Sequence, residues 1–304
     1  MVESSAIQVR VPASSANLGP GFDALALALG LYLRCTLRKS QQGLQITVSG
    51  TDTATIPHDE SNLIWKAFTR LAGGQTKSGV ELEIVNEVPI GKGLGSSAAA
   101  IVAGLALANE WFELKRSKDE IIKIATEMEG HPDNVAAAVR GGLVVSCQTE
   151  DGTVVAVNSP LQANLEVALV VPELQLPTEQ ARAALPANYS RPDAVFNLQR
   201  VALLVSALRE GHPDLLAEAM RDRFHQPYRA PLVPGFQEIL ELRGIPGLLG
   251  LALSGAGPSV VAFCSGHTLE VGEAIASCFR KHGIKAATHQ LPIDSKGLVV
   301  KRVA

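Results

Sequence analysis

The sequence predicts an α+β protein with two domains. The chain has 304 residues, which suits two domains of ordinary size. Segments in which apolar residues alternate, as they do in strands, are interspersed with segments that carry apolar residues at helical spacing. The pattern changes at a turn formed by Asn158–Pro160, so we expect one domain at residues 1–160 and a second at residues 161–304.

Composition favours a folded chain with a large core and argues against a nucleic-acid partner. Hydrophobic residues make up 46% of the chain and charged residues 19%, so there is enough apolar surface to bury and disorder is not expected. The formal net charge is −3, and lysines and arginines form no large cluster. A nucleic-acid-binding surface would need such a cluster, so we expect none.

The cysteines and the N-terminal residues predict a cytoplasmic location. The first residues lack the basic region and apolar core of a signal peptide. Segment Gly244–Leu269 has no charged residue and is long enough to span a bilayer, but its glycines and prolines predict buried strands, so we expect no membrane partner. The cysteines show no CxxC pair and no metal-ligand spacing, which predicts buried thiols in a reducing compartment: Cys35, Cys147, Cys264 and Cys278.

The first expected domain begins with strands. Ile7, Val9 and Val11 alternate with polar residues, and the strand is expected to break at the following loop of Pro, Ser, Asn and Gly. The other expected elements of this domain are a strand at 43–50, a helix at Ser61–Leu71 capped by Ser61, a strand at Val80–Val85, a helix up to Asn109, a helix at Lys118–Glu129 stopped by Gly130, and a turn, short helix and strand within His131–Cys147.

The second expected domain begins with apolar strands and continues with alternating helices and strands. The segment after Gly244 reads as a strand, a glycine loop and a second strand. The expected helices are near Glu179–Ala184, at Ala194–Arg209, at Asp214–Asp222 and near Val271–His282, and strands close the chain.

A glycine- and serine-rich stretch, Pro89–Ala100 (PIGKGLGSSAAA), joins a predicted strand to a predicted alanine-rich helix. The first N–H groups of a helix lack partners within the helix and carry a partial positive charge, which an anion such as phosphate can satisfy. Gly91, Gly93 and Gly95 allow the backbone to approach such an anion closely. The stretch is therefore predicted to bind phosphate.

Two other interpretations of this stretch are weaker. A tight connection between strand and helix with a serine cap would have the same composition, but the order of glycines and serines favours phosphate. The Walker A motif GxxxxGK[ST] is absent, because Lys92 stands on the wrong side, and Ser96 after Gly95 excludes GxGxxG. Ser96 and Ser97 can add hydroxyl groups, one of them to a bound magnesium ion.

Three blocks of the sequence resemble the GHMP kinases, a family that includes galactokinase, homoserine kinase and mevalonate kinase. Pro89–Ala100 resembles the central family motif P-x-x-x-G-L-G-S-S-A-A. Val11–Leu29 resembles the first block of homoserine kinases, and Leu253–Phe263 resembles the third glycine motif of the family. The blocks follow the family's order and span most of the chain. The resemblance implies a GHMP kinase fold, with an N-terminal ATP-binding domain and a C-terminal ferredoxin-like α/β domain.

The resemblance also implies that ATP and Mg²⁺ bind at the central block. Ser97 and Glu129 are then the magnesium ligands, with Glu127 as the alternative because both glutamates lie near a helix end. Asn62 matches a position near the adenine. The residues implied to contact the nucleotide in the block are Pro89, Ile90, Gly91, Lys92, Gly93, Leu94, Gly95, Ser96, Ser97, Ala98 and Ala99.

Segment Glu129–Gly142 has the form found in homoserine kinases, so the implied acceptor is L-homoserine and the implied product O-phospho-L-homoserine. Homoserine carries an ammonium and a carboxylate, and its site needs groups of both signs. Asp23 suits the ammonium, and Asn17 can bond polar groups. Arg182 and Arg229 suit the carboxylate. The other residues implied to line the acceptor site are Thr178, His131, Asp133, Gly255 and Gly257.

Asn134 stands where several relatives have a catalytic aspartate. An amide cannot accept the proton of the acceptor hydroxyl, so the implied catalysis rests on positioning and charge neutralisation, which dominate phosphoryl transfer. Ser97 and Glu129 complete the implied catalytic set.

Plainer interpretations exist for the single residues and for the function. Asn and Asp are common in turns for local reasons, and most arginines are exposed. A GHMP kinase for another small alcohol, such as mevalonate or shikimate, is the nearest functional alternative, and a catalytically inactive nucleotide-binding regulator is the other. The first block and the EGHPDN segment argue against the former, and the intact glycine loop and both arginines argue against the latter. A homodimer is expected from the family alone.

Overall fold

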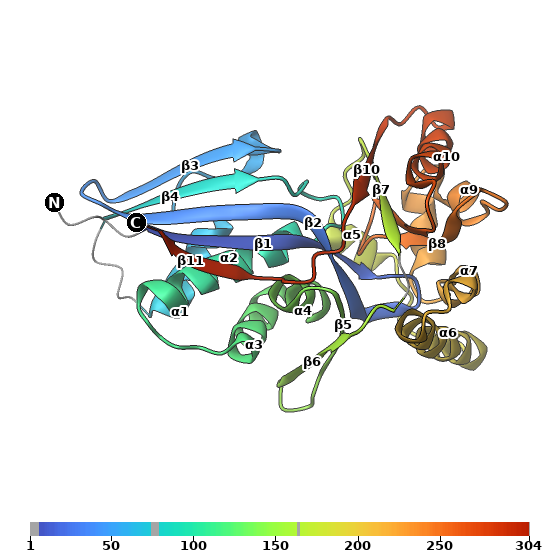
Figure 1. Ribbon diagram of the computed structural model, residues 1–304, viewed down its shortest axis with the longest axis horizontal. Helices are drawn as coiled ribbons and strands as arrows, with labels where there is room; N and C mark the ends of the chain where they lie inside the picture. Colours follow the sequence, from blue (N-terminus) through green and yellow to red (C-terminus); the bar gives the residue numbers. More distant parts are fainter. Residues whose placement is uncertain (1–5, 74–78, 163–164, 304) are drawn as a thin grey trace.

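The computed structural model describes residues 6–73, 79–162 and 165–303. Within these ranges the chain folds around a seven-stranded sheet and a four-stranded sheet. Figure 1 shows the two sheets at opposite ends of the molecule, with the long strands β1 and β2 reaching from the first toward the second. The α+β architecture with two domains, predicted from the sequence, is confirmed.

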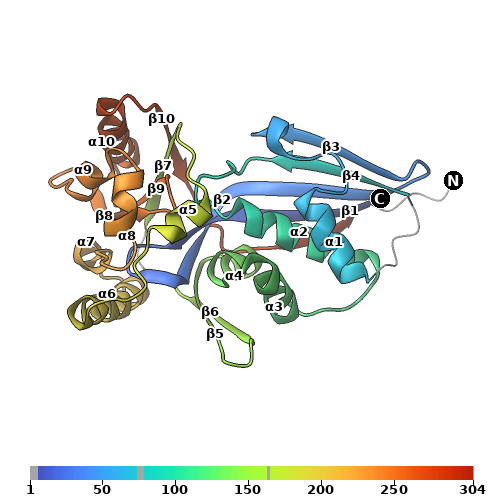
Figure 2. The same ribbon diagram turned by 180° about the vertical axis from the view of Figure 1, so that it is seen from behind.

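The first sheet has the order β11-β1-β2-β4-β3, and β5 pairs with both β2 and β6. Its strands are β1 (Ala6–Asn17), β2 (Gly21–Ser40), β3 (Leu44–Gly50), β4 (Gly79–Asn86), β5 (Leu143–Gln148), β6 (Val154–Ser159) and β11 (Val299–Val303). All described pairs are antiparallel except β3 with β4. Four helices lie together on one side of this sheet (Figures 1 and 2): α1 (Leu63–Ala72), α2 (Ser96–Trp111), α3 (Lys118–Glu129) and α4 (Asp133–Arg140).

The second sheet is antiparallel and has the order β10-β7-β9-β8. Its strands are β7 (Glu166–Pro172), β8 (Leu248–Leu253), β9 (Val260–Cys264) and β10 (Ala286–Leu291). The helices of this half are α5 (Thr178–Ala183), α6 (Arg191–Glu210), α7 (Leu216–Ala219), α8 (Gln226–Arg229), α9 (Phe236–Leu240) and α10 (Thr268–Lys281). Its two faces have separate cores: α9 and α10 pack on one face, and α6 and α7 on the other.

Strand β2 belongs to the cores of both sheets. Leu25, Leu27 and Leu29 pack in the core that contains α6, α7 and one face of the second sheet. Ala26 and Ala28, which point to the opposite face of the strand, pack in the core of the first sheet. All five are fully buried. Because side chains alternate along a strand, the single apolar run LALAL fills two cores at once.

Most predicted elements are present, and α3 has the predicted bounds. The loop expected after Val11 is wrong: β1 continues to Asn17, and only the short turn before Gly21 interrupts the strands. The helix at Ser61–Leu71 exists as α1, but Asn62 and not Ser61 caps it, with its side chain accepting from the N–H groups of Ile64 and Trp65. The helix expected at Asp214–Asp222 is reduced to a 3₁₀ turn followed by the four residues of α7. Helices α8 and α9 were not predicted.

The expected arrangement of the uncharged segment and of the cysteines is largely borne out. Segment Gly244–Leu269 forms the buried strands β8 and β9 around a glycine loop. Among the described residues, no helix is long and apolar enough to cross a membrane. Three cysteines are buried as expected, but Cys147 is exposed at the end of β5. The domain boundary expected at Pro160 falls between β6 and β7, while β11 returns to the first sheet.

We expect Leu27→Ala to lower the free energy of unfolding by about 2–5 kcal/mol, because it removes fully buried volume from the core shared by β2 and the second sheet. Urea unfolding followed by circular dichroism measures this change. Leu198→Ala is the matched control: Leu198 is 66% exposed on α6, so its replacement should change the value by less than ~0.5 kcal/mol. Equal effects of the two substitutions would contradict the shared core.

Candidate active site

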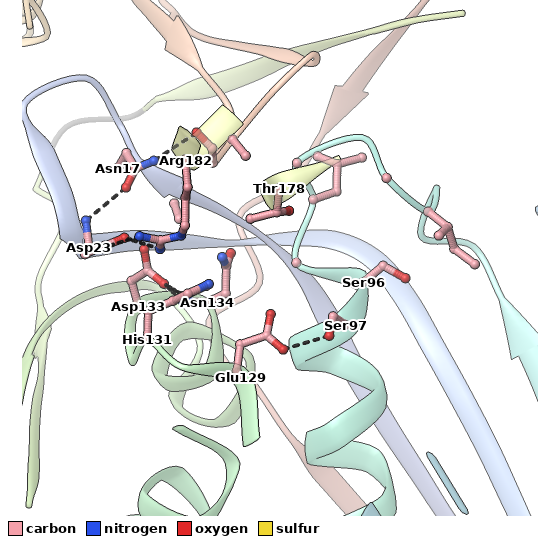
Figure 3. A pocket seen from close by; sticks show the side chains of 18 of the residues that line it. Asn17, Asp23, Ser96, Ser97, Glu129, His131, Asp133, Asn134, Thr178 and Arg182 are labelled. Carbon is pink, nitrogen blue, oxygen red and sulfur yellow. Dashed lines mark hydrogen bonds and ion pairs between the residues drawn. The ribbon is translucent and has the colours of Figure 1, made fainter. Parts of the chain in front are cut away.

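A cavity of about 150 Å³ lies where loops and helix ends of both halves of the chain meet. Figure 3 shows its lining side chains converging from the N-terminus of α2, the β1–β2 turn, the α3–α4 connection and α5. The predicted site residues that line it are Asn17, Asp23, Pro89, Ile90, Gly91, Gly93, Leu94, Gly95, Ser96, Ser97, Glu129, His131, Asp133, Asn134, Thr178, Arg182, Arg229 and Gly255.

The glycine loop before α2 has the backbone conformation that its sequence predicts. Gly91, Gly93 and Gly95 have positive φ angles of 69°, 74° and 65°. Gly95 is the N-cap residue of α2, and no side chain caps this end of the helix among the described residues. A Cβ on Gly95 would lie 2.1 Å from Oγ of Ser14 and 3.0 Å from Oδ1 of Asn134. The loop therefore presents an uncapped helix N-terminus to the cavity and has no room for a side chain there.

The C-terminal glycine motif packs directly against this loop. A Cβ on Gly93 would lie 2.1 Å from the carbonyl oxygen of Ser254, and Oγ of Ser254 donates to the carbonyl of Gly93 over 2.8 Å. Gly255 donates its N–H to the carbonyl of Ala16 over 3.0 Å. The three sequence blocks, far apart along the chain, thus meet at one wall of the cavity.

Five of the predicted site residues do not line the cavity: Asn62, Lys92, Ala98, Ala99 and Gly257. Lys92 turns toward the second sheet, where Nζ donates to the carbonyls of Pro172 and Leu174 over 3.0 and 2.6 Å. Ala98 and Ala99 are fully buried in α2. Asn62 is buried at the start of α1 as its cap.

The side chains of Ser97 and Glu129 meet at the N-terminus of α2. Oγ of Ser97 donates to Oε2 of Glu129 over 2.7 Å, as the dashed line in Figure 3 shows. Glu129 is the last residue of α3, and Gly130 ends the helix in the left-handed conformation. Glu127 points elsewhere, with Oε2 at 3.5 Å from a guanidinium nitrogen of Arg70. The structure thus brings Glu129, and not Glu127, to the cavity.

Asn134 is oriented from behind by Ser14. Oγ of the fully buried Ser14 donates to Oδ1 of Asn134 over 2.7 Å. The backbone N–H of Ser14 bonds the carbonyl of Leu94 over 3.1 Å, which ties this pair to the glycine loop. No described residue accepts a hydrogen bond from Nδ2 of Asn134, so the amide offers the cavity a donor.

Asp23 and Arg182 form an ion pair on the opposite side of the cavity. The guanidinium nitrogens of Arg182 lie 2.8 and 3.0 Å from the two carboxylate oxygens of Asp23. This bond to Asp23 raises the pKa of Arg182 above its ordinary value. The sequence predicted that the two side chains hold opposite ends of one substrate; in the structure they neutralise each other.

Asn17 holds the backbone beside Asp23. Its Nδ2 donates to the carbonyl of Gly255 over 2.8 Å, and its Oδ1 accepts from the N–H of Asp23 over 3.0 Å. Asn17 and Asp23 both have positive φ, a conformation that Asn and Asp tolerate better than most residues. Asn17 thus orients Asp23 as well as lining the cavity.

His131 and Asp133 form a hydrogen-bonded pair in the α3–α4 connection. Nδ1 of His131 lies 2.8 Å from Oδ1 of Asp133, which also accepts the N–H of Asn134 over 2.6 Å. Burial lowers the pKa of His131, but the hydrogen bond and charge of Asp133 outweigh it, and the pKa is raised above its ordinary value. Asp133 therefore stabilises the protonated form of His131 relative to that of a free histidine.

Arg229 is a buried cation without a carboxylate partner among the described residues. Its side chain is 2% exposed, yet it lines the cavity. Nε donates to the carbonyl of Ala181 over 3.2 Å, and Nη1 to that of Gly255 over 3.1 Å. Burial, together with the charge of Arg182, lowers the pKa of Arg229 to about 10. An anion in the cavity would relieve this uncompensated charge.

Sequence reasoning missed two residues behind the cavity, Ser14 and His225. Ser14 lies within the PASSAN stretch, where nothing distinguishes it from its neighbours. His225 stands four residues before Arg229, the spacing at which side chains meet on one face of a helix, and this spacing is the signal that could have found it.

Known proteins resemble the chain over nearly its full length. The model of the GHMP kinases N terminal domain matches residues 62–142, and that of the GHMP kinases C terminal matches residues 204–285. The homoserine kinase of Solibacter usitatus is 49% identical over 98% of each chain, and that of Desulfitobacterium hafniense is 44% identical over 97% of this chain and 99% of its own. The crystal structure of homoserine kinase from Cytophaga hutchinsonii has a TM-score of 0.86 at 30% identity, over 99% of this chain and 98% of that one.

The chain therefore belongs to the GHMP kinase family. Within this family it belongs with the homoserine kinases, the group in which its relatives fall. The predicted fold and the predicted class, an ATP-dependent kinase with a small-molecule acceptor, are confirmed.

Proposed function

We propose that this chain transfers the γ-phosphoryl group of ATP to the hydroxyl of L-homoserine, which gives O-phospho-L-homoserine and ADP, a step toward threonine. One observation carries the proposal. The cavity places an uncapped helix N-terminus, which suits phosphate, beside Asp23, Arg182 and Arg229, which suit the two charges of an amino acid.

The loop from Pro89 to Gly95 and the first turn of α2 would hold the phosphates. Free N–H groups and the helix dipole attract the anion, and the positive φ angles of the glycines turn the backbone toward it. Ser96 and Ser97 add hydroxyl donors at the same end. Asn62 is our weakest nucleotide contact, because its amide already caps α1.

Ser97 and Glu129 fit a magnesium ion. They offer a hydroxyl and a carboxylate oxygen 2.7 Å apart, close to the ~3 Å between neighbouring oxygens of an octahedral shell with bonds of ~2.1 Å. In the described part of the chain no group of three His, Cys, Asp or Glu side chains could hold a metal by itself. Phosphate and water oxygens would complete the shell, as is usual for Mg²⁺. The ion supplies charge neutralisation on the phosphates when bound.

The acceptor would bind as a zwitterion. Its carboxylate gives Arg229 the counter-charge that the protein does not provide. Asp23 and Arg182 neutralise each other, and a molecule with one ammonium and one carboxylate can exchange with both partners without changing the net charge of the site. Asp23 would then bind the ammonium, and Arg182 would share the carboxylate with Arg229.

Catalysis would rest on position and charge. Oδ1 of Asn134 accepts from Ser14, so the group that Asn134 offers is an N–H donor, which can orient a phosphoryl oxygen but cannot remove a proton. Nδ1 of His131 lies 2.8 Å from the carboxylate of Asp133, which fixes the orientation of the ring. We propose that His131 and Asp133 orient the acceptor, and that positioning supplies most of the rate enhancement.

Three further properties stay proposals. The first is the division of the chain into two domains at residue 160, because β11 lies after this boundary in the sequence but pairs with β1 in the first sheet. A cytoplasmic location agrees with three buried thiols. A homodimer is expected from the family.

An acceptor screen tests the proposed function. We expect ADP release with L-homoserine to exceed by far that with mevalonate, shikimate or buffer alone. Mevalonate and shikimate carry a carboxylate but have no ammonium group that Asp23 could bind. Asp23→Asn should raise the KM for homoserine severalfold or more, because it removes the carboxylate that would face the ammonium, and it should leave the KM for ATP nearly unchanged. Faster turnover of mevalonate than of homoserine would sink the proposal.

Gly95→Val should abolish measurable ATP binding, because its side chain would collide with Ser14 and Asn134. Calorimetric titration with a non-hydrolysable ATP analogue measures the affinity, and circular dichroism checks the fold. Gly91→Ala is the matched control: Gly91 also has a positive φ, but nothing lies within 4 Å of its added Cβ. The control should lose far less affinity, and unchanged affinity in folded Gly95→Val would show that the loop does not bind the nucleotide.

Glu129→Gln should lower activity and raise the magnesium concentration needed for half-maximal rate about tenfold or more, because a neutral amide replaces a carboxylate ligand. Glu127→Gln should leave both nearly unchanged, since Glu127 faces Arg70 outside the cavity. Magnesium titration of the initial rate measures both variants. The reverse result would assign the ion to Glu127.

A further inference from the structure

A buried histidine lies behind Arg229. His225 directly precedes α8 and is completely buried. Its Nδ1 lies 3.1 Å from Nη1 of Arg229. Its other ring nitrogen, Nε2, lies 2.8 Å from the carbonyl oxygen of Gly19. The imidazole thus connects the guanidinium at the cavity wall to the turn between β1 and β2.

The partners of the two ring nitrogens determine the protonation of the ring. A guanidinium nitrogen can only donate, so Nδ1 must accept and carry no proton. A carbonyl can only accept, so the proton is on Nε2. His225 is therefore neutral with its proton on Nε2, and burial, which lowers its pKa, favours the same state.

The position of His225 is rigidly held. The side chain of Asp222 is fully buried, and its Oδ2 accepts hydrogen bonds from the backbone N–H groups of His225 and Gln226 over 2.9 and 2.7 Å. Oδ1 of Asp222 accepts Nδ2 of Asn197 over 2.8 Å. The same Oδ2 lies 3.6 Å from Nε2 of His225. Asp222 thus fixes the start of α8, and His225 meets Arg229 across one helical turn.

Arg229 makes two further hydrogen bonds, and both go to backbone carbonyls. Nε and Nη1 donate to carbonyl oxygens that belong to two different segments, at Ala181 and Gly255. Phe22 packs beneath the group, with its ring centre 5.5 Å from the guanidinium carbon and 5.5 Å from the ring of His225. His225 is the one described side chain that accepts a hydrogen bond from Arg229.

We propose that His225 is a positioning residue that orients the guanidinium of Arg229 toward the acceptor carboxylate and so contributes to selection of an amino acid as substrate. The inference rests on the proposed function, because it assigns Arg229 to that carboxylate. It goes beyond that function by assigning the selectivity to a side chain that the substrate does not touch.

Two substitutions of His225 test the contacts of its two ring nitrogens separately. The amide oxygen of His225→Asn can take the place of Nδ1 and accept from Arg229, but the shorter side chain cannot reach Gly19. The amide nitrogen of His225→Gln can take the place of Nε2 and donate to Gly19, but Nη1 of Arg229 then loses its side-chain acceptor. Each variant thus keeps one contact of the wild-type ring.

Steady-state kinetics of the full chain with two acceptors measures how the variants differ from wild type. The second acceptor is 3-aminopropan-1-ol, which is homoserine without its carboxylate. We expect His225→Gln and His225→Ala to raise the KM for homoserine about tenfold, or ~1.4 kcal/mol, and to leave the KM for ATP and for 3-aminopropan-1-ol within about twofold. His225→Asn should keep the KM for homoserine within about threefold of wild type.

The outcomes distinguish the inference from the function on which it rests. If His225→Gln keeps the homoserine KM, or if both acceptors weaken equally, His225 serves only the fold and the inference is wrong while the function stands. If wild type does not phosphorylate homoserine, the proposed function fails and the inference falls with it. Thermal unfolding of each variant separates loss of fold from loss of orientation, and His225→Asn provides a folded comparison.

Discussion

The geometry of the site depends on a backbone contact that only glycine allows. The loop before α2 belongs to the first sheet, and the loop between β8 and β9 belongs to the second. They touch so closely that a Cβ on Gly93 would lie 2.1 Å from the carbonyl oxygen of Ser254. Oγ of Ser254 bonds both Gly93 and Ser15, which brings all three glycine-rich blocks together. This contact sets the N-terminus of α2 at a defined place relative to the arginines of the second half.

Charge is distributed unequally across the cavity wall. Asp23 with Arg182, and His131 with Asp133, are pairs that satisfy themselves. Arg229 has no carboxylate partner among the described residues, and the backbone N–H groups at the N-terminus of α2 have no side-chain cap, although Glu129 lies beside Ser97 there. Burial of an unpaired cation is costly, and a carboxylate and a phosphate are the ligands that would relieve that cost. The site is thus electrostatically incomplete at two neighbouring places, which agrees with a reaction between an anionic nucleotide and an amino acid.

Local signals in the sequence predicted elements well where side chains act within a few residues. Helix α3 has its predicted bounds, because Ser117 and Glu120 form a capping box at one end and Gly130 adopts the left-handed conformation at the other. The errors arose where distant contacts decide. Pro12–Ala16 read as a loop, but pairing with β2 keeps it extended. Asp214–Asp222 read as one helix, but the chain must turn there so that Asp222 can hold the start of α8.

The sequence by itself determined the parts of the site that consist of backbone. Glycines before a helix establish positive φ angles and an exposed helix N-terminus wherever the chain folds around them, since these properties depend on neighbouring residues alone. The tertiary structure decided which side chains meet. It selected Glu129 over Glu127, since the two point in different directions from one helix, and it paired Asp23 with Arg182 and His225 with Arg229. Such partners depend on how the two sheets pack together, and that packing follows from the whole core.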